Sequence, residues 1–110
     1  MRCRGQCEYE LPRSLVGVIE SVCSDYYRRA TAIKNGTASG VVLDEYLRLN
    51  IAIETALEGI EMGIRGELLR DVAFGLGYNK SMISALMAKN TYYQRRRKLI
   101  YDTAKALNLA

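Results

Sequence analysis

Four consecutive cations near the carboxyl end are the residues whose type and spacing best suit binding chemistry. The run 95–98 reads Arg-Arg-Arg-Lys and follows a polar and aromatic turn at 91–94. On a helix with about 3.6 residues per turn, one side carries groups that hydrogen-bond to bases or phosphates. Arginine pairs with guanine edges and glutamine with adenine edges, near the amino-terminal end of a major-groove helix. The residues that share this side are Thr91, Gln94, Arg95 and Lys98.

The opposite side of the same helix, expected over 91–107, predicts how it packs. It carries mainly apolar and aromatic residues, namely Tyr92, Tyr93, Leu99, Ile100, Thr103, Ala104 and Leu107. Arg96 projects into this side, so we expect it to bind an acid or a helix carboxyl end rather than a base. Arg97 lies at the edge, within reach of phosphate. For Tyr92 the alternative to a core position is a hydrogen bond to phosphate.

Two helix-turn-helix frames fit the residues around this helix. In the first, a helix over 67–76 supports a short reader helix over 81–88, with Gly77 in the turn. In the second, the helix over 81–88 is the support and the helix over 91–107 is the reader. The first frame has the better spacing and the second the better chemistry. Together they give these candidate DNA-binding residues: Asn79, Lys80, Ser81, Ser84, Lys89, Asn90, Thr91, Tyr92, Gln94, Arg95, Arg97 and Lys98.

Helical periodicity also runs through the first half of the chain. Apolar residues at three- and four-residue steps predict a first helix over 14–34, ending at Asn35-Gly36, and a second over 42–62. Small residues along the second helix allow close helix approach, within the fold or across a dimer. They are Ala52, Ala56, Gly59 and Gly63. Asn50 interrupts the apolar stripe, as a buried register-setting residue or, the better fit, a surface one.

These segments predict an all-α fold, a small bundle of about five helices with a C-terminal helix-turn-helix. A chain of 110 residues has room for one modest core, so we expect one compact domain. Residues 1–64 would form a leader, a two-helix support and a candidate dimerisation part. Residues 65–110 would form the DNA-binding part.

The charge is unevenly distributed between these parts. Residues 65–110 hold nine Lys and Arg against three acids, a net of +6, whereas residues 1–64 have a net of −2. A basic half is typical of proteins that bind the phosphate backbone, although a solvated charged surface is the simpler alternative.

Several function classes find little support in the residues. Histidine is absent, and no nucleophile–base pair or phosphate-cradling glycine loop is present, so we expect no enzyme and no cofactor. Cys3 and Cys7 lack the further ligands of a metal site, and Cys23 falls on an apolar helical face. No run is apolar enough to span a membrane and no export signal opens the chain, so we expect a cytoplasmic protein.

One family resemblance adds to this interpretation. The stretch LLRDVAFGLGYNKSMISALMAKNTYYQRRRKLIYDTAKALNL, in particular KNTYYQRRRKLI and the LNL tail, resembles small phage transcriptional regulators of the ArpU and RinA type. Those proteins are related in plan to the promoter-binding region four of sigma factors. The likeness covers about the last forty residues well and the first half, through DYYRRATAI, weakly. Ser81-Met82 departs from the usual Ile-Ala pair of the support helix.

The resemblance implies a function and a set of readers. It implies a sequence-specific regulator that binds double-stranded DNA and controls phage late genes in the bacterial cytoplasm. A homodimer is expected, with RNA polymerase as a further partner. The implied readers are Thr91, Tyr92, Gln94, Arg95 and Lys98. The alternative is a helical protein-interaction adaptor, acting in phage packaging or binding RNA polymerase.

Overall fold

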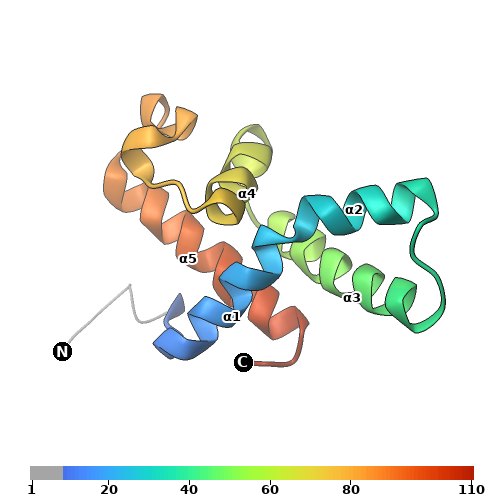
Figure 1. Ribbon diagram of the computed structural model, residues 1–110. Helices are drawn as coiled ribbons and strands as arrows, with labels where there is room; N and C mark the ends of the chain where they lie inside the picture. The colour runs from blue at the N-terminus through green and yellow to red at the C-terminus, as the bar shows by residue number, and fades with distance from the viewer. Residues whose placement is uncertain (1–8) are drawn as a thin grey trace.

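The computed structural model describes residues 9–110, which are helical without any strand, so the predicted all-α bundle is confirmed (Figure 1). The α-helices are α1 (Arg13–Ser24), α2 (Tyr26–Asn35), α3 (Gly40–Leu57), α4 (Arg65–Phe74) and α5 (Lys89–Ala106). Short 3-10 helices η2 (Met62–Ile64), η3 (Tyr78–Lys80) and η4 (Met82–Ala85) lie between them. No helix in this part of the chain is both long and apolar enough to cross a bilayer.

Helix α5 organises the packing. It lies against α3 and α1, while α4 packs on α1 and α2 packs on α3. Figure 1 shows α2 and α3 as a hairpin at one end of the molecule, and the segment between α4 and α5 at the other. The shared core contains buried apolar side chains from α1, α3, α4, α5 and η4, including Ile19, Ile53, Leu68, Ile83 and Leu99, and Tyr26 of α2 packs against it.

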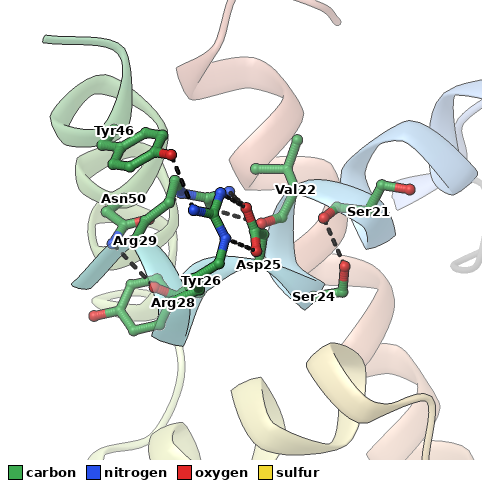
Figure 2. Close-up of polar contacts among 9 residues, drawn as sticks. All are labelled: Ser21, Val22, Ser24, Asp25, Tyr26, Arg28, Arg29, Tyr46 and Asn50. Atoms are coloured by element: carbon green, nitrogen blue, oxygen red, sulfur yellow. Dashed lines mark hydrogen bonds and ion pairs between the residues drawn. The ribbon is translucent and has the colours of Figure 1, made fainter. Parts of the chain in front are cut away.

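The predicted first helix over 14–34 is interrupted, which corrects the sequence interpretation. Asp25 has φ −100° and ψ 6° and separates α1 from α2. The Val22 carbonyl, which would accept from residue 26 in a continuous helix, instead accepts from the Arg29 guanidinium. Figure 2 shows this contact and the Arg28–Asp25 ion pair that flanks the break. The predicted left-handed stop at Gly36, with φ 71°, is confirmed.

The predicted second helix over 42–62 is too long at its carboxyl end. Helix α3 ends at Leu57, so Gly59 and Gly63 lie beyond it, Gly63 within the 3-10 helix η2. Ala52 and Ala56 are buried in the core, which indicates that the small residues permit close packing inside the fold. Asn50 is also buried, at 3% exposure, and the surface position predicted for it is therefore wrong.

Residues 75–88, here called the connector, differ most from the sequence interpretation. Helix α4 ends at Phe74 because Gly75 takes the left-handed conformation, with φ 68°, two residues before the predicted end. The helix predicted over 81–88 is only the 3-10 helix η4. Side chains hold this tighter turn: Ser81 Oγ accepts from the Ile83 N–H, and the Tyr78 hydroxyl donates to the Ser84 and Met87 carbonyls. The first frame therefore has no α-helical reader, and the second has no α-helical support.

Candidate nucleic-acid interface

Helix α5 has the core-facing side that its sequence predicts. Residues Tyr92, Leu99, Ile100, Thr103, Ala104 and Leu107 are all buried, and Tyr93 is half-buried. Tyr92 is fully inaccessible to solvent, so its alternative role as a phosphate donor is wrong. Ser81 is also wrong as a DNA contact, because it is 5% exposed and its hydroxyl caps η4.

A buried hydrogen-bond network fixes α5 to α4. The Tyr92 hydroxyl donates to the Asp71 carboxylate at 2.8 Å and accepts from Arg96 Nη1, also at 2.8 Å. The same Arg96 nitrogen donates to the Leu76 carbonyl, two residues beyond the end of α4. The predicted structural role of Arg96 is thereby confirmed. Burial, and then the bond to Asp71, raises the pKa of Tyr92 to about 12.

Two of the predicted DNA readers are paired with the protein's own acids. Arg95 Nε lies 2.9 Å from both Glu61 carboxylate oxygens, and Lys98 Nζ lies 2.6 Å from Asp102 Oδ2. The hydrogen bond from Arg95 lowers the pKa of Glu61. Arg95 keeps 32% side-chain exposure and Glu61 keeps 51%, so this pair lies at the surface, where ion pairs contribute little.

The segment before α1 lies against the middle of α5. The Tyr9 ring is 5.8 Å from the Tyr101 ring and 5.6 Å from Lys98 Nζ. Arg97 is half-buried and lines a pocket of about 280 Å³ with Tyr9, Leu11 and other residues of that segment. The central part of the α5 outer side is therefore less accessible than the periodicity implied.

The amino-terminal end of α5 presents a different surface. Six of the predicted residues are exposed there, on the connector and the first turns of the helix, and we call them the tip surface: Asn79, Lys80, Ser84, Lys89, Asn90 and Gln94. Thr91, beside them, is half-buried. Lys80 and Lys89 line one groove of about 320 Å³, whose wall includes Tyr93. Because no side chain caps α5, its first N–H groups add positive potential to this end.

The electrostatics of the tip surface follow from the chain around it. Residues 72–101 contain six Lys and Arg and no acid. The acids that border or contact this stretch are Asp71, which is buried, Asp102, which is paired with Lys98, and Glu61, which is paired with Arg95. In the described part of the chain neither Lys80 nor Lys89 forms an ion pair, and each is preceded or followed by an asparagine, Asn79 or Asn90. This combination suits a polyanion whose phosphates and base edges lie side by side.

The acidic partners of Lys98 and Arg95 differ in how far the sequence indicates them. The Lys98–Asp102 pair has the four-residue spacing of neighbours on a helix, which was an available signal. The Arg95–Glu61 pair joins residues 34 positions apart, and no local pattern reports it.

Comparison with protein-family models, curated proteins and solved structures finds nothing that matches the chain.

Other kinds of site have little support in the described residues. Residues 9–110 hold no cluster of three or more side chains able to bind a metal ion. Cys23 is buried, and burial raises the pKa of its thiol to about 12. Cys3 and Cys7 lie outside the described residues.

Proposed function

We propose that this protein is a sequence-specific regulator of transcription that binds double-stranded DNA through the tip surface. The observation that carries the proposal is the set of exposed lysines and amides around the start of α5, within 30 residues that contain no acid. The resemblance to ArpU- and RinA-type regulators adds phage late genes as the target. The proposal also includes a homodimer as the active form and RNA polymerase as a further partner.

The tip surface offers different side chains to phosphates and to bases. Lys80 and Lys89 are placed to neutralise phosphates, which supplies most of the affinity of such proteins. Asn90 and Gln94 are exposed one turn apart on α5, and their amides can pair with adenine edges in the major groove. The proposal thus shifts the readers from Arg95 and Lys98 toward the amino-terminal end of the helix.

The salt dependence of duplex binding tests the proposal. With about three phosphate contacts, we expect the logarithm of the binding constant to fall against the logarithm of salt with a slope of roughly −3. The double variant Lys80→Ala/Lys89→Ala should weaken binding about tenfold and reduce the slope by about 2. Lys34→Ala, an exposed lysine at the end of α2, is the matched control and should bind as the wild type does.

A slope near zero for the wild type would reject DNA binding. A loss of affinity in Lys34→Ala equal to that in the double variant would show that binding is a general charge effect and reject the tip surface.

The Arg95–Glu61 pair gives a second prediction. Glu61→Gln removes the carboxylate that holds Arg95, and we expect duplex affinity to rise severalfold because the guanidinium becomes available to a phosphate. Stability should change by less than about 1 kcal/mol, since the pair is exposed. Fluorescence anisotropy with labelled duplex measures the affinity. Glu58→Gln, an exposed glutamate of the same turn, is the control, and an equal gain there would contradict a specific role for Glu61.

A protein-interaction adaptor is the second candidate function, and the α2–α3 hairpin favours it. Val41, Val42 and Ile51 of α3 are large apolar residues with exposed fractions of 83%, 51% and 54%. Exposed apolar residues on a projecting element are typical of surfaces that meet protein. Sedimentation of the purified chain with and without duplex separates the two candidates. Association with RNA polymerase that needs Ile51, combined with no retention of DNA, would favour the adaptor.

A further inference from the structure

Two large apolar side chains extend from the connector between the lysines of the tip surface. Met82 is 73% exposed and Leu86 is 69% exposed, while Ile83 beside them is buried in the core at 1%. Ile83 therefore anchors the turn, and its two apolar neighbours are left in water. The exposure of both apolar side chains to water is unfavourable, and burial of their surface against a binding partner would be favourable.

The connector holds these side chains on a rigid frame. Ser81 Oγ accepts from the Ile83 N–H at 3.0 Å, and Ser84 Oγ donates to the Ser81 carbonyl at 2.8 Å. The Tyr78 hydroxyl closes the other side through the Ser84 and Met87 carbonyls, the latter at 2.7 Å. Because the backbone of the turn is fixed in this way, binding through Met82 and Leu86 would cost little backbone conformational entropy.

The surroundings of these residues separate them from the other exposed apolar side chains. Phe74 is 62% exposed and also lies in the stretch 72–101, but its ring stacks on the Tyr27 ring with centroids 5.9 Å apart. Met62 is 79% exposed but follows Glu61 directly, and Val41 lies one turn before Asp44 and Glu45. Met82 and Leu86 instead lie within the acid-free stretch 72–101, between Lys80 and Lys89. Their partner should therefore combine a dense negative surface with an apolar interior that long side chains can enter.

We propose that Met82 and Leu86 form an apolar wedge that inserts at a base step of the bound duplex and bends it. This inference rests on the proposed DNA-binding function and adds a deformation of the DNA to it. Leucine and methionine are among the side chains that wedge between base pairs, whereas thymine methyl groups are usually met by smaller or flat ones. An anionic membrane is a poorer fit, since a four-residue 3-10 helix offers no amphipathic face to bury.

The test measures DNA bending and affinity together in the full chain. Two duplexes of about 30 base pairs with the same base composition carry fluorophores at both ends; one has central TA and CA steps, the other A-tracts. Pyrimidine–purine steps are easily unstacked and A-tracts are stiff. For the wild type we expect energy transfer to report a bend of about 20–90° on the flexible duplex, with tighter binding than to the stiff one.

The variant Met82→Ala/Leu86→Ala should lose the bend, the preference for flexible steps and about tenfold in affinity for the flexible duplex, while its salt slope remains. Because both side chains are exposed, its thermal unfolding midpoint should match the wild type. Met62→Ala is the matched control, an equally exposed methionine beside an acid, and should bend DNA as the wild type does.

The outcomes separate the wedge from DNA binding itself. Salt-dependent binding without a bend, or equal bending by the double variant, would overturn the wedge and leave the proposed function standing. No salt-dependent binding of either duplex would overturn both. Vesicles of phosphatidylserine and phosphatidylcholine form a further arm: binding to them that is lost in the double variant, with duplex bending intact, would reassign the two side chains and overturn the wedge.

Discussion

Tyr92→Phe is expected to lower the free energy of unfolding by about 3 kcal/mol, although it removes a single oxygen atom. That oxygen donates to the buried Asp71 carboxylate and accepts from Arg96, so its loss weakens the contacts of two charged groups. A buried charge that loses its partner costs more than the average hydrogen bond contributes. Urea unfolding at neutral pH measures the change.

Tyr101→Phe is the control for this prediction, since Tyr101 lies on the same helix and the described residues show no hydrogen bond from its hydroxyl. It should change stability by less than about 0.5 kcal/mol. If both variants lose the same stability, the Asp71–Tyr92–Arg96 network does not fix α5 to α4.

The same hydroxyl predicts how stability depends on alkaline pH. The folded protein holds the Tyr92 proton up to a pKa of about 12, whereas an unfolded tyrosine releases it near its ordinary pKa of 10.0. The folded state binds more protons between these values, so the contribution of Tyr92 is complete below about pH 10 and is lost toward pH 12. The wild type should therefore lose more stability than Tyr92→Phe between about pH 9 and pH 11.5. Equal losses would contradict the prediction.

Local patterns predicted the parts of this structure that depend on local chemistry. The apolar side of α5, the stop at Gly36 and the inward position of Arg96 all follow from residues one or two turns apart. The break at Asp25 could not be found in this way, because Arg29 takes the Val22 carbonyl through its side chain and leaves the apolar periodicity intact. A periodic pattern reports which side is buried, but it does not report where backbone hydrogen bonds are exchanged.

The candidate site shows the same division. The exposure of Gln94 was predictable from the helix period, whereas Lys89 and Asn90 lie before the predicted helix over 91–107 and form the first turn of α5. The pairing of Arg95 with an acid was not predictable, since Glu61 follows the end of α3 and is brought to Arg95 by the packing of α3 against α5. The conformation of the connector was not predictable for a further reason. Its residues Ser81, Ser84 and Tyr78 bind backbone groups in place of helical hydrogen bonds, and residues of these types fit several backbone conformations.

The second large effect is expected at the opposite end of the molecule, where a buried arginine joins α2 to α3. Arg29 is 3% exposed, and its Nε donates to Asn50 Oδ1 at 2.7 Å, as Figure 2 shows. Asn50→Leu should lower the free energy of unfolding by about 3 kcal/mol, because the guanidinium stays buried with one acceptor fewer. Arg29→Met should cost a similar amount, since it leaves the Asn50 amide and the Val22 carbonyl without this donor.

The double variant Arg29→Met/Asn50→Leu separates hydrogen bonding from packing. Replacing both buried polar partners with apolar groups of similar size is often nearly neutral. The free energy of unfolding lost in the double variant should therefore be about 2 kcal/mol smaller than the sum of the two single losses. Arg28→Met is the matched control: Arg28 is the neighbouring arginine, its pair with Asp25 is 60% exposed on the arginine side, and its loss should cost less than about 1 kcal/mol.

Additive losses in this cycle, or an equal loss in Arg28→Met, would show that the Arg29–Asn50 contact has no special part in joining α2 to α3. The cycle also bears on function, since the hairpin and the connector lie at opposite ends of α5 and its neighbours (Figure 1). Below their unfolding temperature, the Arg29 and Asn50 variants should therefore keep the wild-type salt slope for duplex DNA. A lost slope in these folded variants would move the DNA-binding surface from the tip to the hairpin.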